Sequence, residues 1–218
     1  MARLRIINLG LPKSGTTSLG QALKHAGLAV ADWRIRGGQS KNDRLKRAFV
    51  GRLMYRGYFE SGDPLSMMDE FDAFTEIDIV RDGLNLWPQT DWGLLSAIRH
   101  HHPGAKFILT HRDPEKLSNS MGRWSNLGRT RLPNAAIPGL PEGWGKTDAE
   151  RIRWIEGHTA FCRQVFGTSK DFLEYDIEDD SARDKVSAFL GIDLPWWGVA
   201  NANQNNPGPA SGNESIDQ

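Results

Sequence analysis

The chain has 218 residues, and its 27 Lys and Arg balance its 27 Asp and Glu, so the formal net charge at neutral pH is zero. This length suffices for one α/β domain with a full core. The balanced charge argues against a protein that coats nucleic acid with its whole surface. The only cysteine, Cys162, excludes an intrachain disulfide, and no stretch approaches the about 18 apolar residues of a membrane span.

The N-terminal stretch MARLRIINLGLP carries a short apolar run that arginines interrupt and Pro12 follows. Such a run is too short for the apolar region of a signal peptide, and no small-residue cleavage site follows it. We therefore expect a cytoplasmic protein with no transmembrane segment and no nucleic-acid partner.

Short apolar segments alternate with amphipathic segments along the chain. The apolar, β-branched segments predict strands at residues 4–9, 28–33, 72–77, 106–110 and 171–177. Helical spacing of apolar residues predicts helices at about residues 16–26, 41–59, 91–101, 114–124, 148–166 and 181–190. Gly27 is expected just past the first helix, Pro114 is expected in the first turn of the fourth, and residues 126–146 are expected to form a loop.

This alternation predicts an α/β fold of three layers, with a central parallel sheet covered by helices on both faces. We expect one domain over residues 1–200. Residues 201–218 are rich in Asn, Gly, Pro and Ser, which predicts a flexible C-terminal tail.

The segment GLPKSGTTSL, residues 10–19, joins the first predicted strand to the first helix. A helix N-terminus after such a turn favours anions, because backbone N–H groups and the helix dipole face the ligand. Gly10 and Gly15 keep the spacing of the nucleoside-triphosphate loop G-x-x-x-x-G-K-[ST], but Lys13 precedes Gly15 instead of following it. This displacement disfavours a magnesium-bound triphosphate as the ligand.

The segment HRDP, residues 111–114, follows the predicted strand KFILT. Ligands of open parallel sheets bind at the carboxyl ends of the strands, so this segment and the first loop should border one site. Arg112 at a strand end suits an anion, whereas a magnesium site would favour an aspartate there.

GLPKSGTTSL resembles the 5′-phosphosulfate loop of the sulfotransferases that use 3′-phosphoadenosine 5′-phosphosulfate (PAPS). In that family an arginine at a strand end and a serine eight residues later bind the 3′-phosphate. KFILTHRDPEKLSNSM has this form, with Arg112 and Ser120. At about 3.6 residues per turn, Ser120 lies about two turns along the helix, so both side chains can face one phosphate. Ser118 is a nearby alternative that does not match the spacing.

The resemblance extends to DFLEYDIEDDSARDKVSAFLGIDLP, which looks like the closing strand–helix unit of small bacterial sulfotransferases, and it implies a P-loop NTPase-like core. Two features depart from the family pattern. His111 stands where an apolar or small residue is more usual, and the late Arg-Lys-Gly that also holds the 3′-phosphate in cytosolic members is missing. Asn201, Asn203 and Asn205 are candidates for replacing it.

The resemblance implies in-line transfer of a sulfuryl group from PAPS to an acceptor hydroxyl or amine, with release of adenosine 3′,5′-bisphosphate (PAP). Lys13 would neutralise charge on the bridging oxygen, and no metal is required. The residues implied in donor binding are Lys13, Ser14, Gly15, Thr16, Thr17, Ser18, Arg112 and Ser120.

The base that deprotonates the acceptor is sought among polar residues near the same edge of the sheet. Glu76 and Asp78 follow a predicted strand in FDAFTEIDIV, and both are candidates for the base. Asp78 is favoured, with Glu76 close behind. The alternative is that both carboxylates belong to a solvated loop end without a catalytic role. A carboxylate needs burial or a close partner to act as a base at neutral pH. His111 is a further candidate.

The acceptor is expected to be a small molecule, or a glycan or lipid hydroxyl. Basic residues between Trp33 and Tyr58 predict either a solvated helix face or a surface that meets an anionic ligand. Trp33, Trp87, Trp92 and Trp124 are expected mostly in the core, although one could stack on adenine. Two other functions remain open: a P-loop kinase of small molecules, and a nucleotide-binding module without catalysis.

Overall fold

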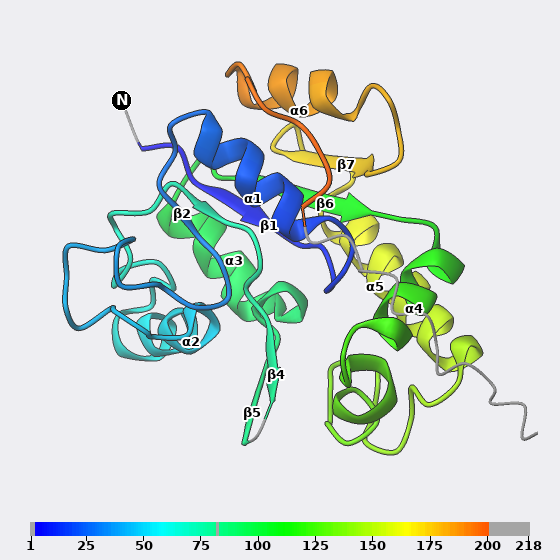
Figure 1. The fold of residues 1–218 in the computed structure, drawn as a ribbon. Helices are drawn as coiled ribbons and strands as arrows, with labels where there is room; N and C mark the ends of the chain where they lie inside the picture. The colour runs from blue at the N-terminus through cyan, green and yellow to red at the C-terminus, as the bar shows by residue number, and fades with distance from the viewer. Residues whose placement is uncertain (1–2, 82, 201–218) are drawn as a thin grey trace, which may run out of the picture.

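A computed structural model describes residues 3–81 and 83–200. Five parallel strands form the central sheet in the order β2–β3–β1–β6–β7 (Figure 1). The strand bounds are Ile6–Asn8 (β1), Val30–Ala31 (β2), Ala73–Phe74 (β3), Lys106–His111 (β6) and Phe172–Asp176 (β7). Because β1 lies between β3 and β6, the segments that follow these three strands are neighbours at the carboxyl edge of the sheet.

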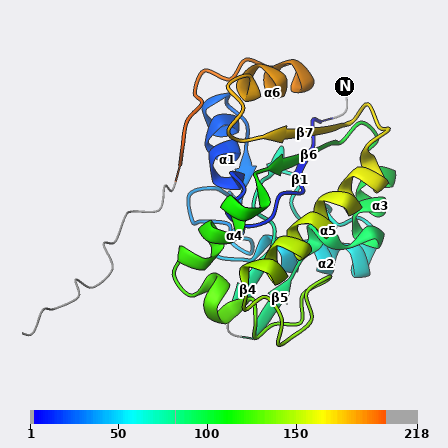
Figure 2. The same ribbon diagram turned by 90° about the vertical axis from the view of Figure 1, so that its right-hand side faces the viewer.

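Helices cover both faces of the sheet, as predicted (Figures 1 and 2). The helix bounds are Thr16–His25 (α1), Val50–Ser61 (α2), Trp92–His101 (α3), Pro114–Arg123 (α4), Asp148–Phe166 (α5) and Ala182–Leu190 (α6). Neighbouring strand residues point to opposite faces. Ile6 therefore joins the core under α1 and α6, while Ile7 joins the core under α2, α3 and α5.

Several local signals in the sequence are confirmed. Gly27 follows α1 with a φ of 83°, and Pro114 occupies the first turn of α4. The helix predicted over residues 148–166 has the same bounds in the structure, and a capping box between Thr147 and Glu150 begins it. The strands β1, β2 and β3 are shorter than predicted, because the chain leaves the sheet within two or three residues to build the loops at its edge.

One predicted helix begins later than expected, and one hairpin was not predicted. The helix expected over residues 41–59 begins only at Val50, because Ser40 and Asn42 use their side chains to bond nearby backbone groups in turns. The stretch after β3 also forms an unpredicted antiparallel hairpin of β4 (Ile79–Arg81) and β5 (Leu84–Leu86), which extends away from the sheet (Figure 1).

The loop predicted over residues 126–146 includes one π-helical turn at Leu127–Arg131. A third apolar cluster, with Val80, Leu117, Leu127 and Trp154 among its members, joins this turn to the hairpin, α4 and α5. The proposed C-terminal tail, residues 201–218, lies outside the described residues, and so do Asn201, Asn203 and Asn205. Within residues 3–81 and 83–200, none of the helices combines the length and apolar character that a membrane crossing requires.

Candidate functional site

A cavity of about 850 Å³ opens at the carboxyl edge of the sheet. Its walls come from the segments after β1, β3, β6 and β7, from α4 and from the chain that follows α6. The predicted site residues on its lining are Lys13, Gly15, Thr16, Thr17, Ser18, Glu76, Asp78, Arg112 and Ser120. The strand order therefore brings together residues that are more than 100 positions apart in the sequence.

The loop after β1 is shaped by close backbone contacts. A Cβ atom on Gly10 would lie 1.9 Å from the Thr110 hydroxyl oxygen, so only glycine fits there. Gly15 has a φ of 95° and begins α1, and Lys13 also adopts a left-handed conformation, with a φ of 73°. A left-handed lysine is uncommon and costs backbone energy, which is typical of residues held in position at functional sites.

Ser14 differs from the other predicted donor-binding residues because its hydroxyl points into the loop itself. The Ser14 Oγ donates to the Leu11 carbonyl oxygen at 2.7 Å and lies 2.8 Å from the Thr110 Oγ1. Ser14 is buried, and its side chain is absent from the described cavity lining. Its hydroxyl therefore stabilises the loop conformation.

Two buried polar residues support the loop, and this role was not predicted from the sequence for either of them. The Asn8 side chain donates to the Thr75 carbonyl oxygen at 2.9 Å and accepts from the Gly10 N–H at 3.0 Å, which ties the loop to β3. His158 of α5 lies with its Nε2 2.7 Å from the Leu9 carbonyl oxygen, at the start of the loop. Burial lowers the pKa of His158, so the neutral ring is favoured and its Nε2–H serves as the donor.

Lys13 lies over an aromatic ring at the cavity wall. Its Nζ is 3.4 Å from the centre of the Trp124 ring, a cation–π contact. Burial lowers the pKa of Lys13, the nearby Glu76 carboxylate opposes this shift, and Arg112 adds to it. Lys13 and Arg112 are therefore close enough for their charges to interact across the cavity.

Arg112 and Ser120 both line the cavity, in agreement with the predicted spacing. Ser118, the alternative, is buried between α4 and α5, where its hydroxyl donates to Asp148 at 2.7 Å and accepts from Arg151 at 2.9 Å. Arg112 donates from its Nε to Glu178 at 3.2 Å, an ion pair that the sequence did not indicate.

Two carboxylates that line the cavity follow β3. Asp78 is only 6% exposed and accepts a hydrogen bond from Gln89 at 2.8 Å. Burial, and then the neighbouring Glu76, raise the pKa of Asp78 to about 8. Glu76 is more accessible; burial, and then Asp32, raise its pKa to about 7, while Lys13 and the Thr17 hydroxyl lower it.

The remaining predicted residues divide between the site and the scaffold. His111 faces Asp176, with 3.9 Å between its Nδ1 and the carboxylate, and it is not among the residues that line the cavity. Trp87 is buried against Trp154, whereas Trp33 and Trp124 do line the cavity.

Further residues that reach the cavity were not predicted. Trp197 lies in the chain after α6, with its ring 5.9 Å from the Tyr175 ring, and both aromatic residues line the cavity. In the same segment the Ala200 N–H donates to the Ser18 hydroxyl at 3.0 Å.

Part of the predicted basic region lies next to this site. Arg34, Arg36 and Arg47 line a second cavity of about 540 Å³, which shares Trp33 with the first. In the part of the chain that the structure describes, no group of three or more His, Cys, Asp or Glu side chains is arranged to hold a metal ion.

Comparison with known proteins identifies the family to which this chain belongs. The profile of the sulfotransferase domain family matches residues 5–144, which is more than half of the chain. A search of curated proteins found no match.

Two solved structures are similar at low sequence identity. A sulfotransferase from Alicyclobacillus acidocaldarius is 15% identical, with a TM-score of 0.49, and the alignment covers 94% of this chain and 88% of that protein. Mouse sulfotransferase SULT7A1, whose structure contains PAP, is 16% identical with a TM-score of 0.46 over 88% of this chain. This chain spans 58% of the length of the mouse protein. On the match over residues 5–144, the chain belongs to the sulfotransferase domain family.

Proposed function

We propose that this protein is a sulfotransferase that moves a sulfuryl group from PAPS to a hydroxyl or amine of an acceptor. One observation carries the proposal: Lys13 of the loop after β1 and Arg112 and Ser120 of the β6–α4 segment line a single cavity. The cavity thus offers an anion-binding loop and, apart from it, an arginine–serine pair. PAPS carries a phosphosulfate at its 5′ end and a phosphate at its 3′ position, so its charges match these two centres.

The 5′ end of the donor would be held at the N-terminus of α1. In the described structure this helix has no side-chain cap at Gly15 and no acidic residue in its first turn. Its first N–H groups lack partners within the helix and are therefore suited to an anion. The backbone N–H groups of Gly15, Thr16 and Thr17 would bind the 5′-phosphate, and Ser18 would border it.

Lys13 is proposed as the catalytic cation. Charge builds on the bridging oxygen as the S–O bond breaks, and a preorganised ammonium beside that atom stabilises the transition state more than the ground state. Its contact with Trp124 would hold the ammonium in place without neutralising it. This arrangement uses protein groups for the charge stabilisation that magnesium supplies in kinases.

Glu76 is proposed as the base that removes the acceptor proton, in preference to Asp78. A base works best with a pKa close to the working pH, and the pKa of Glu76 is about 7. Asp78, with a pKa of about 8 and a hydrogen bond from Gln89, would be mainly protonated at neutral pH. Asp78 would then line the cavity as a neutral group.

The proposal is tested by a turnover assay with sulfur-labelled PAPS and a panel of acceptors: phenols, sugars, amines and hydroxylated lipids. The expected result is a labelled product, together with one equivalent of PAP, for at least one acceptor class, and a much slower release of both with Lys13→Ala. A folded wild-type protein that releases no PAP with any acceptor, or that phosphorylates acceptors from ATP and magnesium, would contradict the proposal.

A further inference from the structure

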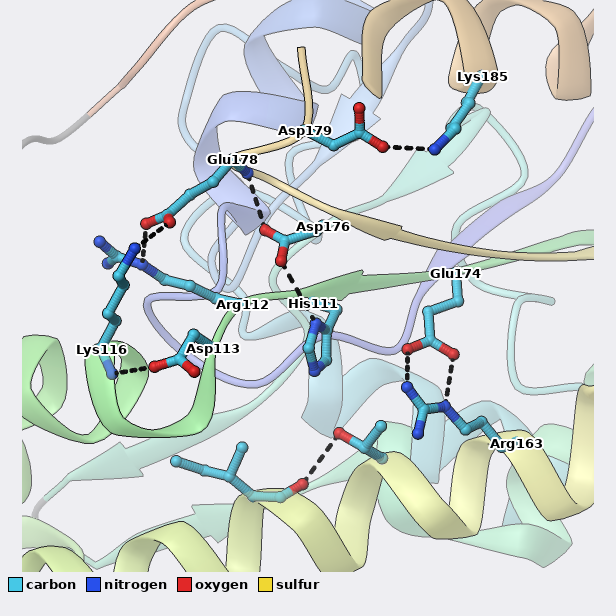
Figure 3. A network of polar contacts seen from close by, with 12 residues as sticks. His111, Arg112, Asp113, Lys116, Arg163, Glu174, Asp176, Glu178, Asp179 and Lys185 are labelled. Atoms are coloured by element: carbon cyan, nitrogen blue, oxygen red, sulfur yellow. Dashed lines mark hydrogen bonds and ion pairs between the residues drawn. The ribbon is translucent and has the colours of Figure 1, made fainter. Parts of the chain in front are cut away.

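One carboxylate bridges two cations next to the arginine–serine pair of Arg112 and Ser120. Glu178, just after β7, accepts from Arg112 Nε at 3.2 Å with one oxygen and from Lys116 Nζ at 2.5 Å with the other (Figure 3). Glu178 lines the cavity, as do Arg112 and Ser120. The two cations hold the pKa of Glu178 below its ordinary value, so Glu178 is charged at neutral pH.

Lys116 and Ser120 are four residues apart on α4 and therefore lie on the same side of the helix. Arg112 reaches this side from the end of β6. In the described structure the Ser120 hydroxyl forms no hydrogen bond with another residue. Arg112 and Ser120 line the cavity, whereas Lys116 does not and is joined to this centre by its ion pair with Glu178.

The other charged groups around this position come from neighbouring elements. Asp113, at the start of α4, accepts from the Lys116 backbone N–H at 2.9 Å. Asp176 accepts from the Glu178 backbone N–H at 2.8 Å and faces His111 (Figure 3). These two carboxylates are therefore engaged with backbone groups, and Glu178 alone pairs with both cations.

We propose that the Glu178 carboxylate occupies the place of the donor 3′-phosphate in the unliganded protein, and that Lys116 is an additional residue for binding this phosphate. The inference rests on the proposed function. On binding, the phosphate would replace the carboxylate between Arg112 and Lys116 and would accept from Ser120 as well.

The proposal predicts a specific cost for the 3′-phosphate. Before a phosphate can bind, the Glu178 side chain must leave two ion pairs, and afterwards it remains nearby as a like charge. A carboxylate that serves only to orient Arg112 would have the opposite effect, because its removal would loosen the arginine and weaken binding. The sign of the effect of Glu178→Gln therefore separates the two roles.

The experiment is calorimetric titration of wild type, Glu178→Gln and Lys116→Met with PAP and with adenosine 5′-phosphate. Glu178→Gln should bind PAP about tenfold more tightly, and Lys116→Met about tenfold more weakly, because each change alters a charge next to the phosphate. Neither change should alter the affinity for adenosine 5′-phosphate more than about twofold. Asp179→Asn is the matched control, because it removes the Asp179–Lys185 ion pair from the same loop but does not border the cavity.

Weaker or unchanged binding of PAP to a folded Glu178→Gln protein would overturn the inference, and so would an unchanged affinity in Lys116→Met. Both variants alter exposed side chains, and the melting temperature without ligand checks that each is folded. If the wild type bound PAP no more tightly than adenosine 5′-phosphate, the proposed donor itself would be wrong. That outcome differs from one in which the wild type prefers PAP but the Glu178 and Lys116 variants do not change its affinity as predicted, which would overturn only this inference.

Discussion

The Lys13 ammonium lies 3.4 Å from the centre of the Trp124 ring, and no carboxylate of the described residues forms an ion pair with it. A cation–π contact of this kind stabilises a lysine by about 0.5–2 kcal/mol. Unlike a salt bridge, it keeps the positive charge available. Together with the left-handed backbone of Lys13, it fixes the ammonium at the wall of the cavity.

Replacing Lys13 tests whether this charge acts in the transition state. Lys13→Ala should lower kcat by about 10²–10³, because removal of one preorganised donor typically has an effect of this size. Lys13→Arg should recover part of the rate, since it keeps the charge but changes its geometry. The measurement is kcat and KM at saturating donor, with circular dichroism as the folding control. An unchanged kcat in Lys13→Ala would limit this lysine to ground-state binding.

Trp124 is expected to act by positioning Lys13. Trp124→Leu should lower kcat several-fold and should also lower the affinity of Lys13 for protons, because the cation–π contact that stabilises the ammonium is lost. Trp124→Phe should preserve most of the rate because it keeps an aromatic face. The combined variant Lys13→Ala/Trp124→Leu should be no slower than Lys13→Ala alone. Additive losses in this double-mutant cycle would show that the two side chains act independently.

The pH dependence of the reaction distinguishes the two acidic residues. If Glu76 is the base, kcat/KM should increase about tenfold per pH unit below its pKa of about 7 and level off above it, because only the carboxylate accepts the proton. Glu76→Gln should lose about 10²–10⁴ in rate. Asp78→Asn should retain most of the activity. If the pH dependence of kcat/KM were lost in Asp78→Asn but kept in Glu76→Gln, Asp78 would be the base.

Asp78 should also make stability depend on pH. Its pKa rises from 3.8 to about 8 on folding, so between these values the folded state binds a proton that the unfolded state has lost. The free energy of unfolding should therefore fall as the pH rises through this range. Asp78→Asn removes this contribution, and its melting temperature should exceed that of wild type by a larger margin at about pH 8 than at about pH 5. The same margin at both pH values would contradict the raised pKa.

The elements that local signals define could be predicted from the sequence. Gly15 and its neighbours indicate the loop before α1, and Pro114 indicates where α4 begins. Such positions can be predicted because helix caps and turns depend on residues that are adjacent in the sequence. The β4–β5 hairpin was missed although an Asp-Gly dipeptide, a typical hairpin signal, stands at positions 82–83.

The surroundings of the site could not be predicted in the same way. His158 reaches Leu9 over 149 positions, and the contact between Glu178 and Arg112 spans 66. Such contacts depend on the strand order. The difference in burial between Glu76 and Asp78 likewise depends on tertiary packing, such as the contact of Gln89 with Asp78. No local sequence pattern indicates that contact.

The central claim is that the cavity binds a nucleotide with a 3′-phosphate, and thermal unfolding with PAP and with ATP–magnesium tests it most directly. A ligand that binds only the folded state at about 100 times its dissociation constant adds about 2.7 kcal/mol to the free energy of unfolding. PAP should therefore raise the melting temperature of the wild type by several degrees, with or without EDTA, and should do so much less in Arg112→Ala. ATP–magnesium should produce a smaller shift, because it lacks the 3′-phosphate. A shift with ATP–magnesium that equals or exceeds the shift with PAP, and that EDTA abolishes, would contradict the account and favour a kinase.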